Sequence, residues 1–540
     1  MRRTSKPVFE ASVKMEVQAG SAFSGTCRKP LVFFDCGWNT VPSESCAMKW
    51  RILPLLLVMS GSVFAAGGVE SRPYHIIPEP VEVSTSSGVC KSPKILKQAA
   101  NKALGPEGYK LTIKPQGVEI QAGDRAGLFY AKNTLEQLQA QYRDGGIPCG
   151  VIEDKPRFGW RSMMMDTARH FVPVEDVKKF IDVMSFYKFN KLHFHLTDDQ
   201  GWRLPVPGYP KLESVASRRK ETFGNKTPHG GMYTKEQLKD LVKYAAARNI
   251  EIIPEIDVPG HNQALCTAYP EFLCFPNPKL EVRTNAGISY TLVCPGNPDV
   301  WKFYNAVFNE LKDIFPSQYV HLGGDEAPED NWMKCPKCAD FREKAGIREE
   351  NKKAAAQKEM VEFFTRCAKM LKSRGKTAVF WYEPMGKYPD GVIVTTWRGG
   401  HTPKTVANTT GDKVDVICAP NGKCYFDYPQ LPGDWPSGQP DTGWMPVNTL
   451  ENVYSLEPGH GLSAKEMERV RGVDCCLWAE RLPNIERVFY QAYPRALALV
   501  ETAWSPKEVK NLNRFKDKLE FHKKFMQEKW GISLERPEKK

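Results

Sequence analysis

Two adjacent carboxylates, Asp325 and Glu326, follow a glycine pair at the end of a short apolar segment. Gly323 and Gly324 have no side chains, so backbone and a ligand can approach closely there. Because neighbouring residues in a strand point to opposite faces, both carboxylates can reach one cleft only if the strand ends here. Two such close carboxylates raise the pKa of one of them, and a partly protonated carboxyl is what a general acid needs. An isolated Asp–Glu pair is more often a solvated part of a loop, so the rest of the chain decides.

The elements that must position this pair are short apolar segments separated by amphipathic stretches of helix length. The predicted helices include 174–187, 235–248, 300–315 and 353–374. Strands that alternate with helices predict an α/β fold, here a (β/α)8 TIM barrel over residues 157–505. The eight predicted strands are 162–166, 191–196, 251–255, 319–322, 378–381, 392–396, 415–419 and 473–477.

Polar and aromatic residues stand at or just past the carboxyl ends of these strands. In a TIM barrel that end carries the active site, so segments far apart in the sequence converge on one cleft. The residues in such positions are Asp166, Arg169, His195, Asp198, Glu255, Asp257, Asp325, Glu326, Trp381, Trp397, Trp478 and Glu480.

A smaller domain is expected before the barrel. Residues 73–152 contain short alternating segments, such as 109–113 and 117–120, and a helical stretch at 128–142, which together predict a small α+β domain. After the barrel, residues 506–540 predict an amphipathic helix that ends near Trp530, followed by a tail.

The N-terminal region has the features of an export signal that starts at a second methionine. Met48–Arg51 is positively charged, residues 52–64 are apolar but too few to span a bilayer, and Ala65 and Ala66 form a small-residue cleavage site. We therefore expect a signal peptide at 48–66, a non-native upstream extension at 1–47 and no retained membrane anchor. The mature chain is expected to be exported, either periplasmic or extracellular.

The composition of the chain indicates which class of partner is disfavoured. The chain has 540 residues and a net charge of +12, but no basic run interleaved with aromatics, so nucleic acid is disfavoured as a partner.

Of the 15 cysteines, twelve follow the predicted signal. Cys335 and Cys338 have the spacing of half a zinc site, but the nearby sequence offers no second pair. A local disulfide or free thiols is therefore favoured over a metal, and no cofactor is expected.

Six sequence blocks follow one another along the chain: 165–171 (MDTARHF), 193–203 (HFHLTDDQGWR), 254–261 (PEIDVPGH), 321–326 (HLGGDE), 425–428 (YFDY) and 477–480 (LWAE). Together they resemble family 20 of the glycoside hydrolases, the β-N-acetylhexosaminidases. The likeness covers nearly all of residues 75–510, in the family's order. The resemblance implies an exo-acting, retaining enzyme that removes terminal β-linked GlcNAc or GalNAc from an oligosaccharide or glycoconjugate. In this family the substrate's own acetamide attacks the anomeric carbon and gives an oxazolinium intermediate.

The same resemblance implies roles for individual residues. Glu326 would protonate the leaving oxygen, Asp325 would hold the acetamide N–H, and Tyr425 would donate to the acetamide oxygen. Asp198 and His261 would orient the acid and tune its pKa. The remaining expected contacts are indole walls from Trp381, Trp397 and Trp478, and hydroxyl contacts from Arg169, Asp427 and Glu480.

Three rival functions stay open at the level of sequence. A non-catalytic glycan-binding protein would lack Asp325 or Glu326, a metal-dependent hydrolase would use His193 and His195, and a two-carboxylate β-glycosidase would cleave glucosides without an acetamide. We expect His193 to be structural. The sequence does not fix GlcNAc against GalNAc, the linkage or the oligomeric state, and residues 430–449 are expected to supply an aromatic near the leaving group.

Overall fold

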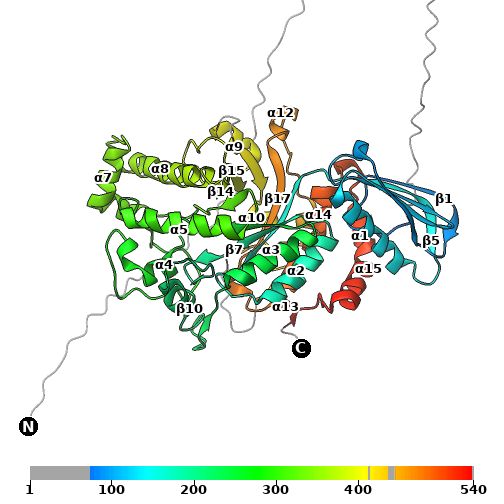
Figure 1. Ribbon diagram of the computed structural model, residues 1–540, viewed down its shortest axis with the longest axis horizontal. Helices are drawn as coiled ribbons and strands as arrows, with labels where there is room; N and C mark the ends of the chain where they lie inside the picture. The colour runs from blue at the N-terminus through cyan, green and yellow to red at the C-terminus, as the bar shows by residue number, and fades with distance from the viewer. Residues whose placement is uncertain (1–72, 411–413, 436–442, 444, 538–540) are drawn as a thin grey trace, which may run out of the picture. The chain divides into compact units, whose positions relative to one another are not determined.

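The computed structural model describes residues 73–410, 414–435, 443 and 445–537. The expected signal peptide at 48–66 and the upstream extension at 1–47 lie outside the described residues. The described chain begins with a small α+β domain and continues into a closed barrel of parallel strands (Figure 1). The predicted α/β class and the predicted barrel are confirmed.

Eight parallel strands close the barrel, and each coincides with a predicted one to within a few residues. Their order around the barrel is β12-β13-β14-β15-β16-β17-β6-β7, so neighbouring barrel strands are consecutive along the chain except for the last and the first, β17 and β6, which close the barrel. The strands are β6 (Trp160–Asp166), β7 (Lys191–His195), β12 (Glu251–Glu255), β13 (Tyr319–His321), β14 (Thr377–Trp381), β15 (Ile393–Thr396), β16 (Asp415–Cys418) and β17 (Val470–Leu477).

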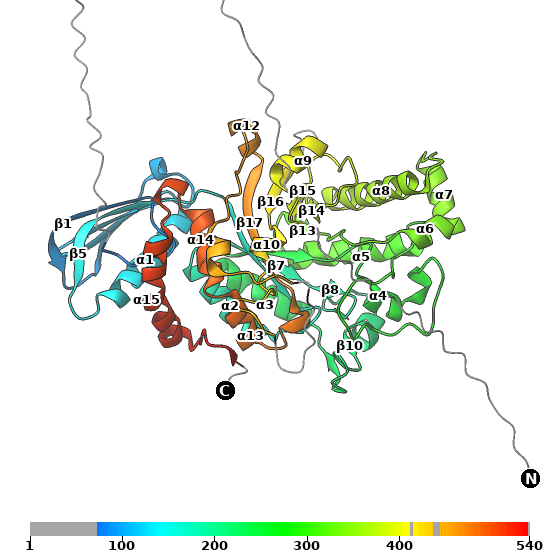
Figure 2. The same ribbon diagram turned by 180° about the vertical axis from the view of Figure 1, so that it is seen from behind.

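The long helices lie outside the strands, as seen from both sides in Figures 1 and 2. α3 starts with a capping box in which Thr234 and Gln237 satisfy each other's backbone N–H groups. The predicted long helices correspond to α2 (Val174–Phe186), α3 (Lys235–Ala247), α5 (Pro298–Ile314) and α8 (Lys352–Lys372). Later helices are α9 (Pro403–Thr410), α10 (Asn421–Cys424), α11 (Leu450–Tyr454), α12 (Ala464–Met467), α13 (Ile485–Ala492), α14 (Arg495–Trp504) and α15 (Leu512–Trp530).

Short elements that the sequence did not predict fill the loops after β7, β12 and β13. They matter because these loops build one end of the barrel. They include β8 (Thr197–Asp198), β9 (Gly201–Trp202), η2 (Leu212–Ala216), β10 (Arg218–Arg219), β11 (His229–Gly230), α4 (Gln263–Ala268), η3 (Pro270–Phe272), α6 (Asp330–Lys334) and α7 (Pro336–Lys344). Three further 3-10 turns are η1 (Lys102–Leu104), η4 (Ala479–Arg481) and η5 (Lys507–Val509).

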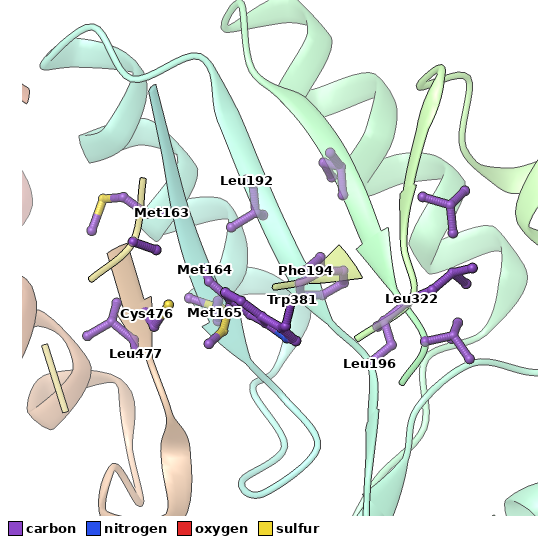
Figure 3. Packing of buried hydrophobic residues seen from close by; sticks show 14 of the residues in the cluster. Met163, Met164, Met165, Leu192, Phe194, Leu196, Leu322, Trp381, Cys476 and Leu477 are labelled. Carbon is purple, nitrogen blue, oxygen red and sulfur yellow. The ribbon is translucent and has the colours of Figure 1, made fainter. Parts of the chain in front are cut away.

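Barrel strands are buried on both faces, which explains why they are apolar runs rather than alternating ones. The side chains of Met163, Met165, Leu192 and Phe194 belong to the main hydrophobic core (Figure 3). Alternate positions form a separate small cluster made of Trp160, Ile253, Val379, Ile393 and Ile417. Because side chains alternate along a strand, this second set fills the barrel interior below the catalytic end.

The N-terminal domain is a five-stranded sheet with one long helix, α1 (Arg125–Gln141). Its own core contains Tyr109, Leu111, Ile120 and Leu135, all buried. The sheet order is β1-β5-β3-β4-β2. The strands are β1 (Glu82–Cys90), β2 (Ile95–Ala100), β3 (Tyr109–Lys114), β4 (Gly117–Ala122) and β5 (Ile147–Asp154).

A buried ion pair joins this domain to the barrel. Lys188 Nζ lies 2.9 Å from Asp154 Oδ2, and both side chains are fully buried. The same carboxylate accepts hydrogen bonds from Tyr109 Oη, Trp504 Nε1 and the backbone N–H of Val81. Every oxygen of this buried charge is thus satisfied within the protein.

Cys335 and Cys338 are free cysteines, within the expectation of free thiols or a local disulfide, but the fold gives them cysteine neighbours that the nearby sequence does not show. Their sulfurs lie beside those of Cys274 and Cys294, which belong to an earlier loop. Cys274 and Cys294 precede Cys335 and Cys338 by 41 to 64 residues along the chain, so they are not part of the nearby sequence. In the described part of the chain, no helix combines the length and the apolar character needed to cross a bilayer.

Candidate active site

A cavity of about 420 Å³ opens at the carboxyl end of the barrel strands. Ten of the eleven residues that the sequence analysis assigned to the site line this cavity. The exception is Trp381, which is buried beneath it. The ten are Arg169, Asp198, His261, Asp325, Glu326, Trp397, Tyr425, Asp427, Trp478 and Glu480.

The glycine pair after β13 delivers both carboxylates to the cavity. Gly323 and Gly324 have φ values of +60° and +98°, in the region that favours glycine. A β-carbon on Gly323 would lie 2.0 Å from Asp257 Oδ1, and one on Gly324 would lie 2.5 Å from Phe364 Cζ. Larger residues are therefore excluded at both positions. The strand ends at His321, before the two carboxylates, as predicted.

Asp325 is a buried carboxylate with an unused acceptor. Its Oδ1 has no hydrogen-bond partner among the described residues, although a buried polar atom is normally paired. Burial raises the pKa of Asp325 to about 7, and the neighbouring Glu326 contributes to the rise, while His261 lowers it. The free oxygen is thus available for a ligand donor.

Glu326 is more accessible, with a side chain 27% exposed to the cavity side. Its backbone has a φ of +48°, an uncommon value for a residue with a side chain and one often found at functional sites. Burial raises the pKa of Glu326, while the positive charges of His261 and Arg398 lower it. A carboxyl with a raised pKa next to an open cavity can deliver a proton to a ligand.

His261 lies between this carboxylate pair and a second acidic pair. Its Nε2 is 3.8 Å from Glu326 Oε2 and 3.9 Å from Asp325 Oδ2, and its Nδ1 is 3.3 Å from Asp198 Oδ1. Burial by itself would lower the pKa of His261, but Asp198 and Asp199 outweigh it and hold that pKa well above the usual range. His261 therefore carries a positive charge toward Asp325 and Glu326.

Arg169 is held in place by acids on its inner side. Its Nη2 lies 2.7 Å from Asp198 Oδ2 and its Nη1 lies 3.2 Å from Asp166 Oδ2. Glu480 is 3.9 Å away, and the guanidinium lies over the Trp478 ring at 4.9 Å. With two acids fixing its orientation, Arg169 reaches the cavity as a rigid donor.

Aromatic rings form the walls of the cavity. Trp478 contacts Trp381, Tyr425 and His195, with ring centroids 5.7, 6.0 and 5.2 Å away. Trp397 completes the set, and its buried Nε1 has no hydrogen-bond partner among the described residues. Burial raises the pKa of Tyr425 well above its usual range, so its hydroxyl stays protonated and able to donate.

Asp427 and Glu480 lie together on the β17 side of the cavity. Asp427 Oδ1 is buried and unpaired among the described residues. Burial raises the pKa of Asp427 well above its usual range, and the charge of Glu480 adds to this effect. Two acids with a free acceptor suit a ligand that presents several hydroxyl groups.

A hydrogen-bonded network lies beneath the cavity, inside the barrel. Glu255 accepts from Trp381 Nε1 at 2.9 Å and also bonds His195 Nδ1, and its oxygens lie 3.0 Å from His193 Nε2 and 2.8 Å from His321 Nδ1. The other nitrogen of His193 lies 2.8 Å from Asp474 Oδ2. Both ring nitrogens of His193 thus face buried carboxylates, as expected for a structural residue.

Several lining residues were not predicted from the sequence. The sequence places Asp257 at the end of a strand without indicating a role. In the structure the backbone N–H of Gly324 donates to Asp257 Oδ1 at 3.1 Å. Arg481 lies over the Trp435 ring at 5.0 Å, which brings one aromatic of the 430–449 loop to the rim. Trp444 lies outside the described residues. The other unpredicted lining residues are Ala286, Gly287, Ile288, Asn421, Tyr428 and Met445.

Known proteins match the chain over both domains. A β-hexosaminidase from Akkermansia muciniphila is 48% identical over 491 residues, which cover 90% of this chain and 97% of the relative. A crystal structure of a β-N-acetylhexosaminidase superposes with a TM-score of 0.81 at 49% identity, covering 86% of this chain and 97% of the other. The Streptomyces plicatus N-acetyl-β-hexosaminidase, in complex with Thio-NAglucal, gives a TM-score of 0.72 at 28% identity, covering 86% and 97%.

Family models locate the same two parts. The model of the catalytic domain of glycosyl hydrolase family 20 matches residues 158–507, and the model of domain 2 of that family matches residues 79–155. The barrel, the smaller domain before it and the cavity with its carboxylate pair therefore have one explanation. The chain belongs to glycosyl hydrolase family 20 and is a glycoside hydrolase of the β-N-acetylhexosaminidase type.

Proposed function

We propose that Glu326 is the general acid and base of an exo-acting, retaining β-N-acetylhexosaminidase and that the sugar supplies its own nucleophile. The observation that carries this assignment is the unpaired, buried Oδ1 of Asp325 beside the accessible carboxyl of Glu326. One carboxylate has a free acceptor for an N–H, and the other has access to the leaving group. A pair with these separate environments suits two different roles.

In the first step the acetamide oxygen of the substrate bonds to the anomeric carbon while the bond from that carbon to the glycosidic oxygen breaks, and Glu326 gives its proton to the departing oxygen. Asp325 accepts the acetamide N–H and stabilises the positive charge that develops on the resulting oxazolinium ring. Tyr425 donates its hydroxyl to the acetamide oxygen and aims it at the anomeric carbon. In the second step the carboxylate of Glu326 removes a proton from water, which opens the ring with retention at the anomeric centre.

The indoles of Trp381, Trp397 and Trp478 give this reaction a dry, shaped environment. Trp478 faces the cavity directly, while Trp381 supports it from below and donates to Glu255. Excluding water strengthens each electrostatic interaction with the substrate. Orienting the acetamide in such a site removes several kcal/mol from the barrier, on the order of the effective-molarity advantage of about 7–11 kcal/mol.

The far end of the cavity is suited to the unmodified end of a sugar. Arg169, Asp427 and Glu480 would hold the 3-, 4- and 6-hydroxyls, and the free Oδ1 of Asp427 supports this placement. Polar groups gathered at that end suit the free hydroxyls of a terminal sugar, which is why we propose exo action on a terminal residue. Since GlcNAc and GalNAc differ at the 4-hydroxyl, their discrimination would depend on these three residues.

His261 and Asp198 act as positioning residues. The positive charge of His261 lowers the pKa of both Asp325 and Glu326, and Asp198 keeps His261 charged. Without this charge, the two buried carboxyls would hold their protons more tightly.

A substrate comparison tests the proposal. We expect rapid hydrolysis of aryl β-N-acetylglucosaminides and no measurable hydrolysis of aryl β-glucosides, which lack the acetamide. A thiazoline that mimics the oxazoline should be a competitive inhibitor. Equal rates on both substrates, or an active enzyme that does not bind the thiazoline, would contradict substrate assistance.

We further propose that the chain is exported and acts on oligosaccharides or glycoconjugates outside the cytoplasm. The support is the charged and apolar pattern of residues 48–66. N-terminal sequencing of the mature protein should find a new end near Ala65 or Ala66, and an intact N-terminus on the active protein would contradict export by this signal.

A related structure supports the proposed substrate. An exo-β-N-acetylglucosaminidase from Vibrio harveyi has been crystallised with N-acetylglucosamine, which agrees with a terminal GlcNAc substrate.

A further inference from the structure

Four cysteines from three separate segments lie together outside the active site. Cys274 follows η3, Cys294 precedes α5, Cys335 is the residue just before α7 and Cys338 is in its first turn. Three of the four are fully buried, and Cys274 is half-buried. None of them lines the catalytic cavity.

The spacing of the four sulfurs is that of a metal-binding tetrahedron. Sγ of Cys338 is 3.5 Å from Sγ of both Cys274 and Cys294, and Cys294 Sγ is 3.8 Å from Cys335 Sγ. All four sulfurs lie within 4.8 Å of one another. Zinc–sulfur bonds of about 2.3 Å give a tetrahedron with edges of about 3.8 Å. Two disulfides would instead pair the sulfurs at about 2.05 Å.

The backbone around the sulfurs is built for this close approach. Two similar turns face each other, Cys294-Pro295-Gly296 and Cys335-Pro336-Lys337-Cys338. A β-carbon on Gly296 would lie 2.0 Å from the carbonyl oxygen of Lys337, so only glycine lets the turns meet. The amino end of α7 also favours negative charge on Cys335 and Cys338.

We infer that Cys274, Cys294, Cys335 and Cys338 bind one zinc ion as four thiolates. Four sulfurs in a tetrahedron select zinc or iron among the common metals, and zinc forms such sites without redox chemistry. The four sulfurs that bind an iron–sulfur cluster would not all lie this close together, because they are divided among two or four iron atoms. With four protein ligands the ion has no open position, so its role is structural rather than catalytic.

The ion would anchor a loop that reaches the active site. Cys274 and Cys294 stand at the two ends of residues 275–293, and Leu273 and Val293 form a β-bridge there. Residues 286–288 of this loop line the cavity. The other two ligands belong to the segment that follows Glu326 along the chain. Zinc would therefore hold one wall of the cavity against the segment after β13, and its loss should affect substrate binding more than chemistry.

Metal and thiol content of the full-length enzyme test the inference. The protein is purified without added metal and analysed by inductively coupled plasma mass spectrometry, and the folded protein is then titrated with a mercurial while a chromogenic chelator reports the zinc released. We expect one zinc per chain, which leaves as the mercurial binds the four thiolates. Iron in place of zinc, a metal-free protein, or intact-mass evidence of two disulfides among these cysteines would overturn the assignment.

Matched variants separate the site from general effects of cysteine replacement. Cys274→Ser and Cys335→Ser should lose at least about tenfold in zinc affinity, lower the Tm and raise KM more than they lower kcat. Cys367→Ser replaces a buried cysteine outside the cluster and should keep full zinc content.

If the cluster variants do not fold, cobalt is substituted into the native protein. The absorption bands of tetrahedral cobalt–thiolate coordination are then expected, and their absence would overturn the inference. Activity on aryl β-N-acetylglucosaminides is scored separately, so a metal-free but active enzyme would contradict only this inference.

Discussion

Two buried acids in this molecule, Asp154 and Asp325, have opposite surroundings. Asp154 accepts four hydrogen bonds, from Lys188, Tyr109, Trp504 and a backbone N–H, and none of its oxygens is free. Asp325 is almost as buried, yet its Oδ1 has no partner among the described residues. Burying an unpaired polar group costs about 1–3 kcal/mol. At the cavity lined by Asp325 a substrate can complete the pairing and offset that cost.

The largest expected effect is on the catalytic side of this comparison. Glu326→Gln keeps the shape of the side chain but removes the transferable proton. We expect kcat/KM on natural glycans to fall by about 100- to 10,000-fold, the usual contribution of general acid catalysis. Aryl substrates with very good leaving groups should be affected much less, because they need no proton. An equal loss on both substrate types would remove Glu326 from the role of general acid.

Replacing Asp325 tests whether its free oxygen serves the substrate or the fold. Asp325→Asn should lower kcat by about 100- to 1,000-fold, similar to the loss of one pre-organised electrostatic contact. The Tm should stay constant or rise, because a buried charge is removed. Thermal unfolding and steady-state kinetics on the same preparation check both parts. A large drop in Tm would mean that Asp325 has a structural role comparable to that of Asp154.

The reverse pattern is expected at Lys188. Lys188→Met leaves the Asp154 charge buried without its cation, and breaking such a pair costs about 3–5 kcal/mol of unfolding free energy. The kcat of the folded fraction should not change, because neither residue lines the cavity. Denaturant unfolding gives the stability, and the double variant Lys188→Met/Asp154→Asn should recover part of it. A loss of kcat without a loss of stability would contradict the comparison.

The smallest effect is expected in the pH dependence. In the proposed mechanism Asp325 must be ionised to accept the acetamide N–H, so kcat/KM should fall as the pH drops through about 7, the pKa of Asp325. Glu326 must be protonated, so kcat/KM should also fall as the pH rises above its pKa. His261→Gln removes a positive charge that lowers both pKa values, so both limbs should move to higher pH.

The control for this shift is His460→Gln, which changes an exposed histidine away from the catalytic cavity and should leave the profile in place. A His261→Gln profile that keeps both limbs at their original pH would mean that His261 does not tune the carboxyls.

The sequence predicted the barrel well because its signals are local. Each strand is a short apolar run with polar residues at its carboxyl end, so the eight strands and the direction of Asp325 and Glu326 follow from neighbours along the chain. The rim was harder to predict. Arg481 enters through a 3-10 turn, and residues 286–288 arrive on a loop with no regular pattern. The partners of Cys335 lie in another loop altogether, and only the folded chain brings them within bonding distance of one ion.

The glycine pair after β13 also determines where this enzyme can be redesigned. Gly323 and Gly324 tolerate no β-carbon, and Glu326 requires its unusual φ, so sequence libraries over 323–326 would yield mostly inactive proteins. The rim residues Ile288, Met445 and Arg481 have no such backbone constraint. Efforts to change which aglycone is accepted should vary these three positions and leave the catalytic turn untouched.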